Sequence, residues 1–226
     1  MRIEALRLPT AHIGHQADFY SRILGLELLE HRQGRLVVQA GYTRLTFTAA
    51  PVGWRGAYHY AFNIPENQLP AARQWLQARV PLIRSSAGQD EFDFSHWEAH
   101  ALYFYDAAGN IVELIARHAL VNGTTQPFDQ AGLLGISEIG LASPAVLGTV
   151  EQLAQSIGLD VFRGSLGESF AAVGGETGLF IVVREGREWF PDTGVLADAL
   201  PLAVTVGTDD GRRFDVSGPP YQVTPA

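Results

Sequence analysis

The sequence predicts an α+β protein built from repeated β-α-β-β-β units, and three observations lead to this fold class. Short strand-like apolar runs alternate with amphipathic helical stretches along the chain. Glycine, proline and Asx turn signals separate them. The pattern also repeats, because Ile3–Leu8, a helix and Leu24-Gly25-Leu26 parallel Ile136–Leu141, a helix and Ile157-Gly158-Leu159. Repetition on this scale indicates a tandem architecture.

The first unit occupies the N-terminal quarter of the chain. A strand is expected at Ile3–Leu8, and a helix at His15–Leu24 that ends before Gly25. Three short strands are expected to follow, at Leu26–Glu30, Arg35–Gln39 and Thr43–Thr48.

The second unit repeats this order. We expect a strand at Tyr58–Ile64 and a helix at Leu69–Arg79 with Pro70 in its first turn. Its remaining strands are expected at Pro81–Ile83, Ala101–Tyr105 and Ile111–Ile115, with a polar insertion from Ser85 to Glu98.

A segment without periodicity around Val121–Pro127 divides the chain into a first module at 1–118, a linker at 119–132 and a second module at 133–226. The third unit then comprises a strand at Ile136–Leu141, a helix at Ala145–Ile157 and strands at Val161–Phe162, Ser169–Val173 and Leu179–Arg184. The fourth unit starts at Leu200–Val206 and is degenerate. Only Asp209–Arg213 and the Gly- and Pro-rich Phe214–Thr224 remain for its helix and last strands.

Composition excludes several function classes. The 226 residues carry a net charge of −8, which argues against nucleic acid and anionic membranes as partners. The absence of cysteine rules out disulfides, thiolate metal sites and cysteine nucleophiles. The start shows no signal peptide and no apolar run has membrane-spanning length, so we expect a cytoplasmic protein.

Glu113 is the most informative single residue. The turn formers Asp106 and Gly109 precede a run of β-forming residues in which Glu113 takes a place that is usually apolar. A carboxylate that faces a sheet interior must be paired, hydrogen-bonded or bound to a metal. Pairing with an arginine such as Arg44 or Arg84 is the alternative to a metal or catalytic role.

Three motifs, in their order and spacing, resemble the vicinal oxygen chelate superfamily of glyoxalase I, bleomycin-resistance, fosfomycin-resistance and extradiol dioxygenase proteins. They are Asp18-Phe19-Tyr20 leading to Leu24-Gly25-Leu26, the strand His59-Tyr60-Ala61-Phe62, and the turn and strand Asp106–Glu113. The resemblance is good over 1–117, fair over 133–184 and weak beyond. It implies cupped mixed sheets made from pairs of units, many of which hold a divalent metal in this superfamily.

The resemblance places ligand positions at Ala5, His59, Glu113, Glu138 and near Pro201. If each half of the chain closes on itself, both cups lack ligands. If the second and third units pair instead, His59, Glu113 and Glu138 form one metal-binding triad, and the other cup, with Ala5 and Pro201, has none.

A purely structural role is the alternative for His59 and for Glu138. His59 lies on an apolar strand, where a lone histidine is more often a core residue than a ligand. Period-2 alternation puts Glu138 on the face of Ile136 and Gly140, and an exposed or capping glutamate is an equal alternative.

The expected chemistry follows from the resemblance. One imidazole and two carboxylates suit Mn²⁺ or Mg²⁺, with Zn²⁺, Ni²⁺ and Fe²⁺ as alternatives, and the single histidine disfavours extradiol cleavage. Both glutamates are candidate catalytic residues, and we assign the proton-transfer role to Glu138, with Glu113 as the firmer ligand. Trp54, Trp97 and His100 are candidates for the substrate pocket, although aromatic residues of this kind are as often core or interface residues.

The sequence thus predicts a glyoxalase-like protein, a metal-dependent lyase, isomerase or transferase acting on a small oxygen-rich molecule. The alternative is a metal-free small-molecule binding protein of the bleomycin-resistance kind. The degenerate fourth unit leaves open sheet surface that a second chain would cover, which makes a homodimer an expectation.

Overall fold

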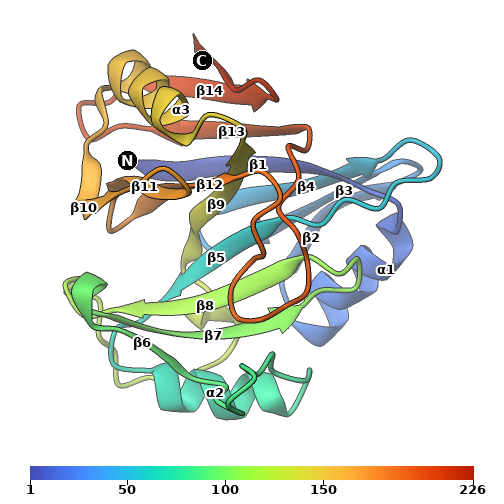
Figure 1. Ribbon diagram of the computed structural model, residues 1–226. Coiled ribbons are helices and arrows are strands. Elements are labelled where there is room, and N and C mark those ends of the chain that lie inside the picture. The colour runs from blue at the N-terminus through green and yellow to red at the C-terminus, as the bar shows by residue number, and fades with distance from the viewer.

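The computed structural model describes residues 1–226, and its strands form two curved mixed sheets (Figure 1). The first sheet has seven strands in the order β15-β14-β13-β1-β4-β3-β2. In that order the strands are Gln222–Pro225, Arg213–Gly218, Leu202–Gly207, Arg2–Thr10, Thr43–Ala49, Arg35–Ala40 and Glu27–Arg32.

The second sheet has eight strands in the order β10-β11-β12-β9-β5-β8-β7-β6. In that order they are Val161–Leu166, Phe170–Gly175, Gly178–Arg184, Gly135–Ser143, His59–Ile64, Ile111–Arg117, Ala99–Tyr105 and Phe92–Phe94. The predicted α+β class with mixed sheets is therefore confirmed.

The pairing of units decides where a site can form. β1 joins β13 antiparallel in the first sheet, and β5 joins β9 antiparallel in the second. The first unit therefore pairs with the degenerate fourth, and the second unit pairs with the third. Each sheet takes strands from both sides of the segment 119–132, which is the exchanged pairing considered above.

Helices cover one face of each sheet. They are α1 (Ile13–Asp18) with a π-helical turn at Phe19–Ile23, α2 (Leu69–Gln77), and α3 (Val146–Leu153) with a π-helical turn at Ala154–Gly158. Apolar residues of these helices and of the sheet faces beneath them bury one continuous core of 45 residues. None of the helices is long and apolar enough to cross a membrane.

Two expected elements are corrected. Pro81–Ile83 forms no strand, since only Leu82 makes an isolated bridge, to Phe104, and Pro81 has no N–H to donate. A strand instead forms at Phe92–Phe94 (β6), inside the expected polar insertion, where Phe-Asp-Phe has the alternation of an edge strand. The fourth unit contains no helix, because its Asp209–Arg213 segment makes a turn and enters β14.

In place of that helix, residues 185–201 form a strap between β12 and β13 that descends across the second sheet (Figure 1). The strap is itself hairpin-like, since the amide of Trp189 donates to the carbonyl of Val195 at 2.9 Å. Its tip is docked, because the carboxylate of Asp192 accepts from the backbone amide and the hydroxyl of Ser86 at 2.8 and 3.0 Å. The strap therefore covers the open face of the second sheet.

Candidate metal centre

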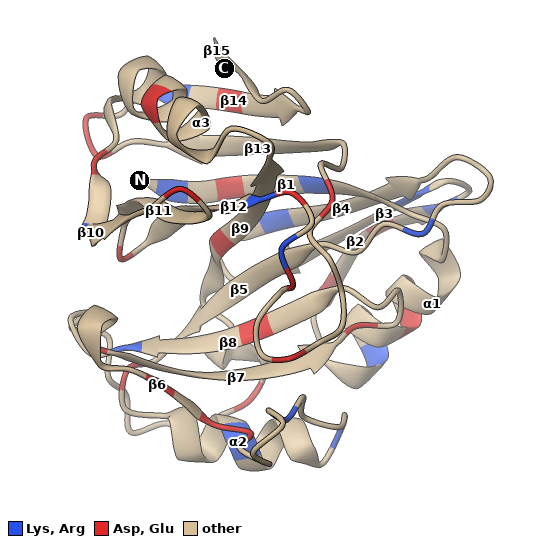
Figure 2. Ribbon diagram, in the orientation of Figure 1, with Lys and Arg blue, Asp and Glu red and all other residues tan.

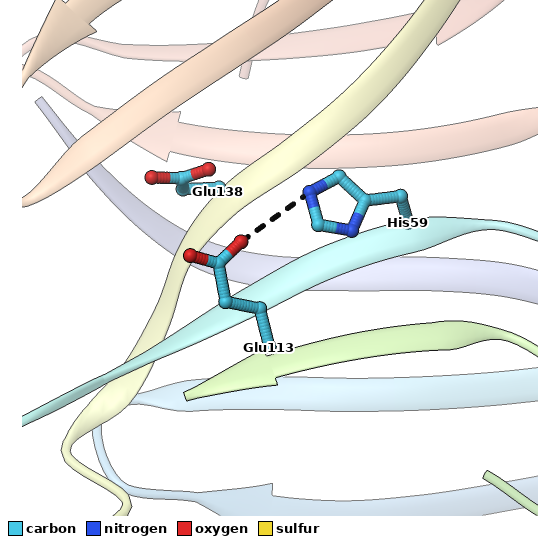
Figure 3. Close-up of side chains that lie close together, drawn as sticks. All are labelled: His59, Glu113 and Glu138. Atoms are coloured by element: carbon cyan, nitrogen blue, oxygen red, sulfur yellow. Dashed lines mark ion pairs between the residues drawn. The ribbon is translucent and has the colours of Figure 1, made fainter. Parts of the chain in front are cut away.

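Three ligand-type side chains meet on the open face of the second sheet (Figure 3). His59 lies on β5, Glu113 on β8 and Glu138 on β9, which are adjacent strands. Ala61 is the register partner of both glutamates, and His59 precedes it by two residues on the same face. Their potential ligand atoms all lie within 4.8 Å of one another, and all three residues are buried.

A β-bulge turns Glu138 toward this face. The register of β5 and β9 shifts between Ala61, opposite Glu138, and Phe62, opposite Ile136, so Ser137 is an extra residue. Ile136 consequently packs in the core between sheets and helices, while Glu138 lines the cup. The expectation that Ile136 shares the face of Glu138 is wrong, because simple alternation does not anticipate a bulge.

His59 is held in one tautomer. Its Nδ1–H donates to the carbonyl of Ile111 at 3.2 Å, which leaves the Nε2 lone pair toward Glu113, whose Oε2 is 3.6 Å away. Burial lowers the pKa of His59 to about 4, so the ring is neutral at neutral pH. A neutral imidazole fixed through its other nitrogen is the form that binds metals.

Glu113 has no arginine partner. Burial raises the pKa of its carboxyl group well above the ordinary value, and the nearby charge of Glu138 raises it further. Arg84 instead pairs with Asp90 at 3.0 Å, and Arg44 lies on β4 of the other sheet. The alternative considered for Glu113, pairing with an arginine such as Arg44 or Arg84, is therefore not found.

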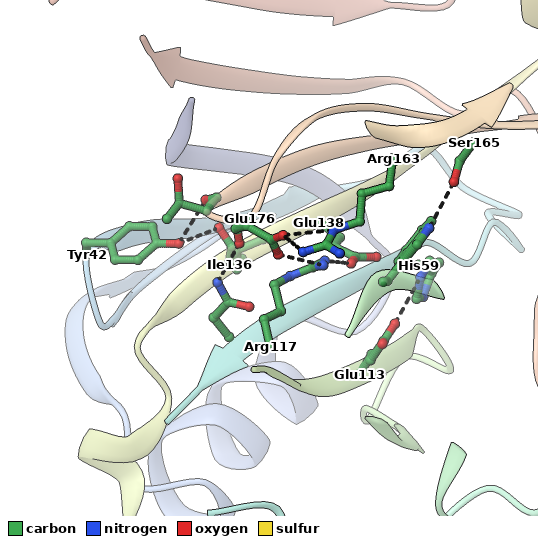
Figure 4. A network of polar contacts seen from close by, with 12 residues as sticks. Tyr42, His59, Glu113, Arg117, Ile136, Glu138, Arg163, Ser165 and Glu176 are labelled. Atoms are coloured by element: carbon green, nitrogen blue, oxygen red, sulfur yellow. Dashed lines mark hydrogen bonds and ion pairs between the residues drawn. The ribbon is translucent and has the colours of Figure 1, made fainter. Parts of the chain in front are cut away.

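Glu138 does have a cationic partner, Arg117, which was not among the residues predicted for the site (Figure 4). Arg117 is fully buried at the end of β8, and its Nη1 is also 3.6 Å from Glu176 Oε2. Glu176 in turn accepts from Arg163 at 2.7 Å. The signal was present, because Arg117 follows Glu113 by four residues on one strand and so shares its face.

The donor set fits a divalent cation. One neutral imidazole nitrogen and two carboxylates converge from three strands, and all three residues are buried. Two buried carboxylates repel each other unless a cation or a proton intervenes. Arg117 pairs directly with Glu138, whereas the only ion-pair contact of Glu113 is with the neutral His59.

The triad forms the floor of a pocket of about 320 Å³ with aromatic walls. The walls come from β6, its following turn, β7, β11 and the strap, and include Phe94, Trp97, Tyr103, Phe170, Trp189 and Phe190. The ring of Trp189 lies 5.2 Å from that of His59, and Arg187 and Glu188 of the strap line the pocket with it. The arrangement can hold a molecule with polar donors at one end and an apolar body.

Of the three predicted pocket residues, the structure brings only Trp97 to this site, where its indole N–H donates to Ser165 at 2.9 Å. Trp54 lies elsewhere, stacked on Tyr58 beside the main core. His100 is also outside, on the half-exposed surface with its Nδ1 2.9 Å from His118 Nε2. The strap, distant in sequence, takes the places expected for these two residues.

The corresponding face of the first sheet has no such triad. Arg7 is the register partner of Thr46 and Ala203, just as Ala61 is the partner of Glu113 and Glu138. Ala5, two residues before Arg7, corresponds to His59. The fourth-unit position is thus Ala203 rather than Pro201, because the sequence comparison across the degenerate unit is two residues out of register.

Comparisons with known proteins address the fold. No protein-family model matches the sequence, and no curated protein sequence matches it. Among solved structures, a candidate dioxygenase from Bacillus subtilis subsp. subtilis str. 168 superposes with a TM-score of 0.62 at 15% identity, covering 96% of this chain and 81% of that one. A glyoxalase I variant from Zea mays gives a TM-score of 0.52 at 12% identity, covering 96% of this chain and 88% of that one.

Both similarities extend over nearly the whole chain, at identities where the fold alone is comparable. They agree with the motifs at Phe19-Tyr20, His59 and Glu113 that led to the same group of proteins. The protein therefore has the fold of the vicinal oxygen chelate superfamily.

Proposed function

We propose that the cup of the second sheet is a divalent-metal site held by His59, Glu113 and Glu138, and that the protein is a metal-dependent enzyme of the glyoxalase-like kind. The observation that carries this proposal is the convergence of three buried ligand-type side chains at the floor of a pocket. Carboxylate-rich sets of this kind favour Mn²⁺ or Mg²⁺, and the imidazole also admits Zn²⁺, Ni²⁺ or Fe²⁺.

A bound divalent ion would act as a Lewis acid toward adjacent oxygens of a small substrate. The residues of the chain have separate tasks. His59 is fixed as a neutral ligand, and Glu138 is oriented by its ion pair with Arg117. Burial raises the pKa of both carboxyl groups, but the charge and hydrogen bond of Arg117 oppose this rise more strongly at Glu138, so Glu113 is the better proton acceptor and donor. We therefore move the proposed proton-transfer role from Glu138 to Glu113.

The pocket also limits the substrate. Aromatic side chains of β7 and the strap, among them Tyr103, Trp189 and Phe190, form most of its wall. They would exclude water and bury the apolar part of a small molecule while its oxygens face the triad. Lyase, isomerase and transferase reactions are all compatible with this arrangement.

One observation favours a second function. The ion pair with Arg117 already compensates the negative charge of Glu138. The buried site therefore needs a metal less than three ligand side chains without a cationic partner would. In that case the aromatic pocket would bind a small molecule by stacking alone, as in binding proteins of the bleomycin-resistance kind.

Metal analysis separates the two. Protein without a histidine tag would be stripped with EDTA, titrated with Mn²⁺, Ni²⁺ and Zn²⁺ by calorimetry, and analysed for bound metal by mass spectrometry. We expect one tightly bound ion per chain, lost in His59→Ala and kept in the control His100→Ala, which changes a histidine outside the pocket. Circular dichroism would confirm that both variants fold. No bound ion in the unmodified protein, or equal loss in both variants, would leave the binding protein as the function.

A further inference from the structure

The face of the first sheet that corresponds to the metal cup carries arginines in place of ligands. We call this face the first-sheet cup, and define it by Ala5 and Arg7 on β1, Arg44 and Thr46 on β4, and Ala203 and Thr205 on β13. It adjoins a pocket of about 520 Å³. The lining residues of that pocket are Arg2, Glu4, Ala5, Gln39, Tyr42, Arg44, Thr205, Arg213, Asp215 and Ala226.

Three arginines on or beside the first-sheet cup have no acidic partner. The chain has no lysine, so its 16 basic residues are all arginine, and ten of them lie within 4.0 Å of a carboxylate. Arg2, Arg7 and Arg44 are among the six that do not, and all three are exposed on or beside the first-sheet cup. Figure 2 shows these basic segments on β1 and the adjacent β4.

The acidic groups of the pocket are already engaged. Arg213 donates through Nε to Glu4 at 2.7 Å, and Asp215 accepts from the hydroxyl of Thr205 at 2.5 Å. Three arginines line the pocket and Arg7 lies beside it on β1, against the side-chain carboxylates of Glu4 and Asp215, so the side chains of this face carry an excess of positive charge. In a chain of net charge −8, such a local excess marks a place where anions gather.

The register explains why the exchange of residues changes the kind of ligand. In the second sheet, Ala61 lies between Glu113 and Glu138, which face a cation site. In the first sheet, Arg7 occupies the place of Ala61, between the uncharged Thr46 and Ala203. The first-sheet cup thus presents positive charge at the place where the corresponding face of the second sheet presents negative charge.

We propose that the first-sheet cup binds a small oxyanion with two or more negative charges, either a phosphate group or a pair of carboxylates. Arg44 and Arg7 are diagonal neighbours on adjacent strands, within reach of one ligand, and a guanidinium binds both kinds of oxyanion in a two-pronged manner. Arg2, whose guanidinium lies 4.8 Å from the ring centre of Tyr42, closes one side of the pocket. This site is independent of the metal centre.

Calorimetry on EDTA-treated protein tests the proposal, with inorganic phosphate in one arm and malonate in the other, and sodium chloride holding the ionic strength constant. We expect binding in at least one arm, weakened about tenfold or more by Arg44→Gln and by Arg7→Gln, since each removes a charged hydrogen-bond donor. The matched control Arg55→Gln removes an exposed arginine that has no ion pair and lies outside this cup.

His59→Ala distinguishes this site from the metal centre, because it should leave phosphate or malonate binding unchanged. The absence of heat in both arms, or the same affinity in Arg44→Gln, Arg7→Gln and the control, would overturn the proposal. Neither result depends on whether the protein binds a metal.

Discussion

Replacing Arg117 with methionine tests how the metal centre is built. The side chain is fully buried, its guanidinium pairs with Glu138 and Glu176, and it lies 5.5 Å from the ring centre of Phe162. Methionine keeps much of the volume and the apolar contacts but removes the charge. The substitution therefore leaves Glu138, itself buried, without compensation.

The magnitude follows from the geometry. At the 3.6 Å between Arg117 Nη1 and Glu176 Oε2, Coulomb's law with an effective dielectric constant of about 20 gives roughly 5 kcal/mol. The contact with Glu138 adds to this attraction, while the burial of all three charges opposes it. Removal of one partner of a buried ion pair typically costs about 3–5 kcal/mol, and we expect a loss in that range for the metal-free protein.

A metal should change this cost. If Glu138 is a ligand, a bound divalent ion supplies the positive charge that Arg117→Met removes. In the variant the ion is also free of the electrostatic repulsion that the guanidinium exerts in the unmodified protein. We therefore expect the destabilisation to shrink by at least about 1–2 kcal/mol in saturating Mn²⁺, and the variant to bind Mn²⁺ at least about tenfold more tightly than the unmodified protein.

The assay is urea unfolding of both proteins in EDTA and in Mn²⁺, with Arg117→Met/Glu138→Gln as the second arm of a cycle. Removing both charges should cost less than removing Arg117 alone, because no buried carboxylate is left unpaired at Glu138. An equal destabilisation with and without Mn²⁺ would refute the reasoning and show that Glu138 serves only as the partner of Arg117.

Three further expectations concern pH, a buried carboxylate and a close contact. Burial places the pKa of His59 at about 4, below its unfolded value of 6.5, so the metal-free protein should lose stability as the pH falls through that window. The raised pKa of Glu113 acts oppositely, through stability lost as the pH rises above 4.5, and urea unfolding in EDTA across this range should show that Glu113→Gln removes only the second loss. Asp106→Ala should cost about 3 kcal/mol or more in urea unfolding, since its buried Oδ2 accepts from several side chains, and a change below about 1 kcal/mol would contradict this. Gly140→Ala would put a Cβ 2.5 Å from Cη2 of Trp189, so the indole must move, and acrylamide quenching of tryptophan fluorescence should increase while circular dichroism stays unchanged.

Local sequence signals determined much of the architecture. Alternation and turn residues located most strands to within a few residues, as at Arg35–Ala40 and Gly178–Arg184, because these strands are bounded by glycines or tight turns. The helices were located to within two residues at each end, but the sequence did not indicate that the first and third finish in a π-helical turn, because apolar spacing does not distinguish this turn from an α-helix. The predicted strand at Pro81–Ile83 does not form, because proline has no N–H to donate to a strand ladder.

The candidate site was likewise only partly predictable from the sequence. The unusual carboxylate on an apolar strand and the histidine motif identified Glu113 and His59 from the sequence. Trp54 and His100 were predicted to line the substrate pocket, but the fold places both of them elsewhere. Aromatic residues lining a pocket differ from aromatic residues in a core only by their neighbours, which composition does not reveal.

The sequence by itself determined the α+β class with mixed sheets, the residue types available for a metal and the absence of a ligand side chain at Ala5. Only the tertiary structure decided that the second unit pairs with the third, since strand pairing between distant units depends on the burial of whole sheet faces. It also decided that a bulge at Ser137 turns Glu138 into the cup, that Arg117 reaches Glu138, and that the strap closes the pocket. Each of these is a contact between segments far apart in the chain, and no local pattern specifies which distant segment will supply the partner.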